Sequence, residues 1–247
     1  MSFDITLDAR QIGESWPAVV KLPADLAGTL AAFDEAEWVQ PAGAGIPVEK
    51  ITVKNVAEAV QSLSQLYAVE EAHNRAQRDV RKQLAARVLA LAAAHTPALI
   101  EQVTPAFDKA VAEFRETVES LPDNHTPTAL LAAGGSAVDA YHRAIAAQQQ
   151  LRVFAAWINS MYTLPGFTGC RREPALILVT ATNRAELTSL LNAKPVQGSE
   201  LNPVYLTAIQ LGLKWGLHDP ATAQQIADGI NSQPVVKKPI QFARLAR

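Results

Sequence analysis

Residues Asn55–His95 read NVAEAVQSLSQLYAVEEAHNRAQRDVRKQLAARVLALAAAH and contain neither proline nor glycine. Asn55 followed by Glu58 has the spacing of a capping box, in which two side chains bind the first free N–H groups of a helix. Apolar residues then recur about every 3.6 positions, as they do on one face of an α-helix. They are Val56, Val60, Leu63, Leu66, Val69, Ala76, Val80, Leu84, Val88 and Leu91. The stretch therefore predicts one amphipathic helix about 60 Å long, at ~1.5 Å per residue.

The middle of this predicted helix, Glu70–Lys82, is unusually polar. Over about three and a half turns, its only apolar residues are Ala72, Ala76 and Val80. One interpretation is a helix that crosses solvent and contacts the rest of the protein along a thin line of alanines. The other is a partner helix at close approach, either in this chain or in a second copy.

Three Thr-Pro pairs follow, and each has the composition of a helix start, with Thr as the N-cap and Pro in the first turn. They are Thr96-Pro97, Thr104-Pro105 and Thr126-Pro127. The apolar positions between Ile100 and Leu121 predict one helix that restarts or kinks at Pro105. Ser136 is expected to cap another long helix that reaches Tyr162. Three long helices with short connections favour an antiparallel bundle.

Short strands are predicted near both ends of the chain. Phe3–Leu7 and Val48–Val53 alternate apolar and polar residues, and Pro174–Thr180 is a continuous apolar run. Shorter helices are expected at residues 24–39, 183–192, 203–215 and 220–230. The fold class is therefore mainly α, an antiparallel bundle of long helices with minor β structure near both ends. The predicted divisions are an irregular N-terminal segment with short strands (1–54), the long-helix bundle (55–165) and a small α+β region with an extended basic tail (166–247).

Charge and cysteine content restrict the function classes. The formal net charge is −2 at pH 7, whereas general binders of nucleic acid or acidic membranes carry a large basic excess. We therefore expect neither, apart from a possible contact through the small basic tail that contains Lys237, Lys238, Arg244 and Arg247. The single cysteine, Cys170, excludes an internal disulfide. The N-terminal sequence lacks a secretory pattern, which favours the cytoplasm or a particle assembled there.

Two acid-x-x-His spacings form the candidate metal site: Glu70 with His73, and Asp139 with His142. Residues three apart share one helix face, so each pair could present a carboxylate and an imidazole to one metal. Di-iron carboxylate bundles use Glu-x-x-His twice, together with one Glu from each of two other helices. Glu101, Glu113 or Glu116 could supply one of these. The alternative assigns both pairs to ion pairs or hydrogen bonds on helix surfaces.

Cys170 precedes Arg171 and Arg172, and two guanidinium groups could activate its thiol. A buried or incidental cysteine is the competing interpretation. Whether Cys170 is reactive is therefore left open by the sequence.

The functional hypothesis from the sequence is a non-enzymatic structural or assembly protein. It would act through helix packing and extended termini, with a second copy or another subunit as partner, in a phage-like or other multi-subunit particle. No cofactor is expected in that case. The alternative is a metal-dependent, di-iron-carboxylate-like bundle enzyme that uses iron or another divalent metal.

Overall fold

The computed structural model describes residues 4–40 and 56–233, and within these ranges the protein is mainly α, as predicted. The chain forms two compact units. Unit 1 contains the described residues of Met1–Val103 together with Ser160–Thr168, and unit 2 contains those of Thr104–Asn159 and Gly169–Arg247. Helix α3 contributes to both units. The three-part division predicted from the sequence stays a prediction.

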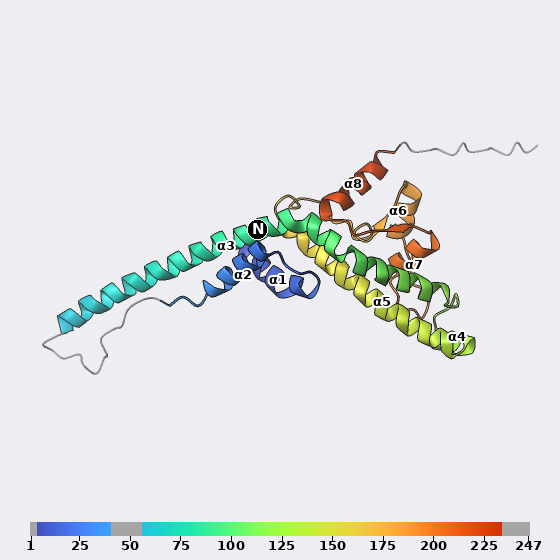
Figure 1. The fold of residues 1–247 in the computed structure, drawn as a ribbon, viewed down its shortest axis with the longest axis horizontal. Coiled ribbons are helices and arrows are strands. Elements are labelled where there is room, and N and C mark those ends of the chain that lie inside the picture. Colours follow the sequence, from blue (N-terminus) through green and yellow to red (C-terminus); the bar gives the residue numbers. More distant parts are fainter. Residues whose placement is uncertain (1–3, 41–55, 234–247) are drawn as a thin grey trace, which may run out of the picture. The chain divides into compact units, whose positions relative to one another are not determined.

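Unit 1 is built from α1 (Ile5–Ser15), the short 3-10 turn η1 (Trp16–Ala18), α2 (Ala24–Glu35) and the first part of α3. In Figure 1, α1 and α2 lie beside the middle of α3. The 3-10 turn η3 (Met161–Thr163) completes the unit. Trp16 is fully buried, and its indole N–H donates to Ser160 Oγ at 2.9 Å. A side chain near the N-terminus is thereby tied to residues 160–168.

The strand predicted at Phe3–Leu7 is wrong, because helix α1 begins at Ile5. Asp4 caps this helix: its Oδ1 accepts hydrogen bonds from Thr6 N at 3.1 Å and Thr6 Oγ1 at 2.6 Å. Ala9, Ile12 and Trp16 then recur at helical spacing, and all three are buried. This helical burial pattern outweighs the short alternation that suggested a strand. The strand predicted at Val48–Val53 lies outside the described residues.

Helix α3 runs from Val56 to Glu119, through the positions where the Thr-Pro pairs predicted a restart or kink. Proline inside a helix costs ~3 kcal/mol because it removes one N–H donor and crowds the preceding turn. Burial along the helix offsets this cost. The buried row continues without a break through Val88, Ala92, Thr96, Leu99, Val103, Phe107 and Phe114.

Helix α3 also contains the one stretch, among the described residues, that is long and apolar enough to cross a membrane by length and composition. The mean hydropathy of this stretch is 1.3, and 33% of it is buried inside the protein. Val88, Leu89 and Leu99 are among the buried side chains of α3. Core helices also contain such stretches, so the composition does not assign α3 to a membrane.

Unit 2 pairs the last part of α3 with α5 (Gly135–Ser160), which runs antiparallel to it (Figure 1). Phe107 and Phe154 meet edge to face, with ring centroids 5.8 Å apart. Helix α4 (Pro127–Ala133) lies between them in the chain and begins at the predicted Thr126 cap. The antiparallel pairing of long helices is therefore confirmed for these two.

The remainder of unit 2 contains α6 (Arg184–Leu191), α7 (Pro203–Gln210) and α8 (Pro220–Asn231). Strands β1 (Val179–Thr180) and β2 (Lys214–Trp215) pair antiparallel, with Val179 opposite Trp215. The predicted strand at 174–180 is therefore shortened to its last two residues. Helix α7 ends earlier than predicted because Gly212 has a φ of +63°, which turns the chain toward β2. Residues 234–247 of the predicted tail lie outside the described ranges.

Candidate functional site

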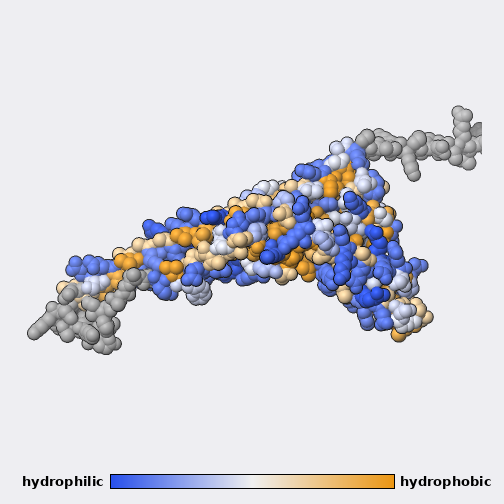
Figure 2. Space-filling view, viewed as in Figure 1, coloured by the Kyte–Doolittle hydropathy of each residue, from blue (hydrophilic) through white to orange (hydrophobic). Residues whose placement is uncertain are grey.

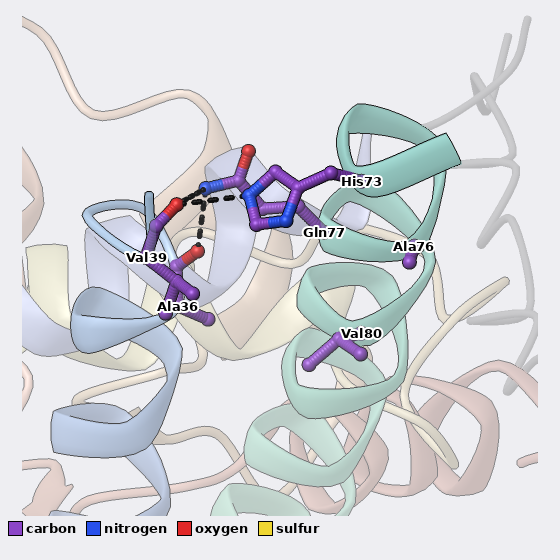
Figure 3. Close-up of a pocket in the computed structure, with 6 residues that line it drawn as sticks. All are labelled: Ala36, Val39, His73, Ala76, Gln77 and Val80. Carbon is purple, nitrogen blue, oxygen red and sulfur yellow. Dashed lines mark hydrogen bonds between the residues drawn. The ribbon is translucent and has the colours of Figure 1, made fainter. Parts of the chain in front are cut away.

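The polar stretch Glu70–Lys82 of α3 binds the C-terminal end of α2 (Figure 3). Gln77 Nε2 donates to three backbone carbonyl groups, those of Ala36 at 2.9 Å, Glu37 at 3.0 Å and Val39 at 3.3 Å. His73 Nε2 lies 3.0 Å from the Val39 carbonyl oxygen. The last carbonyl groups of a helix have no partner within it. The side chains of α3 therefore supply donors that the end of α2 lacks.

Glu37, which follows the last turn of α2, forms ion pairs with residues of both α1 and α3. Its carboxylate accepts from Arg81 of α3 at 3.0 Å and from Arg10 of α1 at 3.2 Å. The Arg81 guanidinium also lies over the Phe33 ring, 4.9 Å from its centroid. A cation over an aromatic ring adds a modest attraction. Arg81 thus contacts both the buried ring of Phe33 in α2 and the carboxylate of Glu37 just after α2.

The other end of α2 is bound to α3 as well. His95 Nε2 lies 3.1 and 3.0 Å from the two carboxylate oxygens of Asp25, in the first turn of α2. The hydrogen bond from His95 holds the pKa of Asp25 below its ordinary value. Helix α2 is therefore attached to α3 by side chains at both ends.

The line of alanines predicted to contact the rest of the chain is not buried in the described part of the protein. Ala72, Ala76 and Val80 are all exposed. The contacts are made by His73, Gln77 and Arg81, which recur every four residues on the neighbouring face of α3. The polar composition of Glu70–Lys82 thus has a physical cause, because this stretch binds backbone carbonyls and a carboxylate.

A hollow of about 200 Å³ lies between α3 and the end of α2. Its lining consists of Ala36, Val39, His73, Ala76, Gln77 and Val80 (Figure 3). The walls are mostly apolar, because the polar atoms of His73 and Gln77 are turned to the carbonyl groups. Val39 and Val80 are 51% and 48% exposed at its rim. Figure 2 shows hydrophobic side chains interspersed with hydrophilic ones along this part of α3.

A second hollow, of about 430 Å³, lies near the end of α2 as well. The second hollow is lined by Arg10, Gly13, Glu14, Leu30, Asp34, Glu37 and Trp38. Trp38 is 70% exposed, the second-highest value among the large hydrophobic side chains of the described residues. We call Trp38, Val39, Ala72, Ala76 and Val80 the α2–α3 surface. It combines an exposed tryptophan with an apolar row and a firmly held backbone.

The residues of the predicted metal site are distributed over both units. Glu70 is exposed on α3, and its neighbour His73 is occupied by the Val39 carbonyl. Asp139 and His142 are exposed on α5 in unit 2. No group of three or more His, Cys, Asp or Glu that could hold a metal ion occurs within 4–40 and 56–233. The four-residue site, with iron or another divalent metal, stays a prediction.

Cys170 is half-buried. The next residue, Arg171, forms ion pairs with two carboxylates. The Arg171 guanidinium pairs with Asp228 and lies 3.5 Å from a Glu173 oxygen. Its backbone N–H donates to Gln224 Oε1 at 3.0 Å. The charge of Arg171 is therefore directed to acidic groups of unit 2.

Unit 2 contains a Ser-His pair that the sequence did not indicate. His125 Nδ1 lies 2.8 Å from Ser199 Oγ, and Ser199 Oγ also accepts from Leu201 N at 3.2 Å. Burial lowers the pKa of His125, whose ring lies 5.7 Å from that of Tyr141. Tyr141 in turn accepts a hydrogen bond from Glu200 N. These contacts bind the loop before α7 to the turn before α4, which is a structural role.

Comparison with known proteins assigns no family: no protein-family model, curated protein or solved structure matches the chain.

Gln77→Leu tests the attachment of α2. The substitution keeps the size of the side chain but removes the donor to three carbonyl groups, and we expect a loss of roughly 1–2 kcal/mol in the free energy of unfolding. Denaturant titration followed by circular dichroism measures it. Gln61→Leu, the same change at an exposed position of α3, should stay within about 0.5 kcal/mol of the parent. Equal losses for both variants would contradict the attachment.

Proposed function

We propose that this protein is a non-enzymatic assembly protein that binds another protein subunit through the α2–α3 surface. The observation that carries the proposal is the exposure of Trp38, Val39 and Val80 together on one firmly held part of unit 1. Burial of apolar area contributes about 25 cal/mol per Å². Tryptophan is among the residues that contribute most energy at protein interfaces. Covering this surface with a partner therefore lowers the free energy of the complex relative to the separate subunits.

The polar groups at this surface also favour burial by a partner. The carbonyl groups of Ala36, Glu37 and Val39 already accept hydrogen bonds from Gln77, and that of Val39 also contacts His73. A polar group that is buried without a partner costs about 1–3 kcal/mol. Because these groups are satisfied within the chain, a partner can cover them without that penalty.

The rigid attachment of α2 further lowers the cost of binding. Asp25 is bound to His95 at one end, and Glu37 to Arg10 and Arg81 at the other. A surface that is already ordered loses little conformational entropy on association. We place the protein in a homo-oligomer or a larger particle, such as a virion, made in the cytoplasm. The proposal rests on α3 and α2, since the predicted extended termini lie outside the described residues.

A photo-reactive amino acid at position 80 tests the proposal in the cells that naturally make the protein. We expect cross-linking to one protein of defined mass, which disappears when Ala76→Glu places a charge in the apolar row. The matched control is the same photo-reactive residue at Asn74, which is exposed on another face of α3. Absence of cross-linking at position 80, or equal cross-linking at both positions, would overturn the proposal.

A further inference from the structure

We infer that the subunit that covers the α2–α3 surface is a second copy of this chain, whose α3 runs antiparallel about a two-fold axis close to Ala76. This inference rests on the proposed function and names its partner. It is carried by the order of charges along α3 and by the positions of the small residues between them.

The first observation is where the apolar row lies on α3. Successive residues of a helix are about 100° apart, so Val69, Ala72, Ala76 and Val80 share a sector of about 80°. One flank of this sector is occupied, because His73, Gln77 and Arg81 bind α2. The opposite flank carries Arg75 and Asp79, which are exposed. A second helix can therefore approach from the side away from α2.

The second observation is charge complementarity on the free flank. An antiparallel copy with its axis near Ala76 brings Arg75 to within about 3 Å, measured along the helix, of the level of Asp79 of the partner subunit, and two-fold symmetry repeats the pair. Further from the axis, Glu71 comes to the level of Lys82 of the partner subunit in the same way. The ion pair of Arg75 with Glu71 within the chain does not compete strongly, because it is 3.6 Å long and its side chains are 72% and 77% exposed. A parallel copy in register would instead bring like charges to the same level.

The third observation is the size of the residues at the axis. Ala76 would face its own counterpart, and Ala72 would face Val80 of the partner subunit. Small side chains let two helices approach to about 8 Å. The contact spans about four turns, and Val39, which lines the hollow beside Ala76 and Val80, adds area at its edge. A stable interface buries roughly 1,200 Å² or more. A contact between two short stretches of helix is small by that standard, so we expect a dimer that dissociates when the protein is diluted into the micromolar range.

Cysteine cross-linking of the purified full chain tests this arrangement. In a Cys170→Ser background, Ala76→Cys should form a disulfide-linked dimer under mild oxidation, because the two sulfurs meet at the axis. Ala90→Cys is the matched control: Ala90 is exposed on the same helix. Antiparallel copies would place its two Cα atoms about 42 Å apart, at ~1.5 Å per residue. Cross-linking at both positions would indicate parallel helices and overturn the inference.

Cross-linking at neither position also overturns the inference, and the photo-cross-linking experiment then separates two outcomes. If position 80 still reacts with a different subunit, the second copy is excluded while the proposed function stands. If position 80 does not react either, both fail.

A charge exchange gives an independent readout. Arg75→Asp should weaken the dimer by roughly three- to tenfold in Kd, as measured by sedimentation, because two exposed ion pairs become repulsive. Arg75→Asp combined with Asp79→Arg should restore the parent Kd, since the pairs re-form with exchanged charges. A double variant as weak as the single one would contradict the pairing.

Discussion

Replacing Phe114 by alanine should lower the free energy of unfolding of unit 2 by about 3–5 kcal/mol. Phe114 is fully buried, and its ring meets those of Tyr205 and Trp215 edge to face, with centroids 6.1 and 6.3 Å away. Tyr205 and Trp215 are themselves 5.5 Å apart. The three residues come from α3, α7 and β2, so the alanine variant leaves a cavity where three elements meet.

The two aromatic residues beside Phe114, Tyr205 and Trp215, are themselves buried. Burial raises the pKa of Tyr205 to about 12, as expected for a phenol held away from water. Trp215 is anchored by the pairing of β1 with β2. A cavity whose walls cannot collapse gives the larger losses in the range measured for such substitutions.

Chemical denaturation followed by tryptophan fluorescence and circular dichroism measures the effect, and Trp215 reports directly on the cluster. Leu131→Ala is the control, because Leu131 is 72% exposed on α4 and its removal should change stability by less than about 0.5 kcal/mol. If the Phe114→Ala and Leu131→Ala variants unfold at the same denaturant concentration, the aromatic cluster is not part of the core of unit 2.

The sequence predicted the features that depend on residues near each other in the chain. Helical periodicity from Val56 onward indicated α3, and Thr126, Asn183 and Pro220 marked the starts of α4, α6 and α8. Caps and periodicity act within one or two turns, so they can be recognised locally. The helix start predicted at Pro97 and the restart predicted at Pro105 were wrong, because burial along α3, which is a tertiary property, outweighed a local penalty. The alternative of a kink at Pro105 stays a prediction.

The candidate site depends on contacts between distant residues, and the sequence did not reveal them. Gln77 binds carbonyl groups 38 to 41 residues away, and His125 meets Ser199 across 74 residues. No local spacing signals such contacts. The polar middle of α3 was recognised as unusual, but its explanation required the position of the end of α2. The tryptophans likewise could not be ranked, although Trp16 is fully buried and Trp38 is largely exposed.

Gly198→Ala should destabilise unit 2 by about 2–5 kcal/mol, because two separate costs add. Gly198 has a φ of +73°, where an L-residue costs roughly 1–2 kcal/mol. An added Cβ would also lie 2.8 Å from both Cα and Cγ2 of Thr126. Thr126 caps α4, and its backbone N–H donates to Asn124 Oδ1 at 3.0 Å, so its backbone cannot yield without loosening the turn. Crowding of this kind costs about 1–3 kcal/mol.

Gly212→Ala separates the two costs. Gly212 has a similar φ of +63°, but nothing lies within 4 Å of an added Cβ. We expect this control to lose only the conformational term of about 1–2 kcal/mol. The difference between the two variants in denaturant titrations measures how tightly the loop at Ser199 packs on Thr126. Equal losses would mean that this loop is not pressed against the turn, and the His125–Ser199 contact would then be too weak to hold the two segments together.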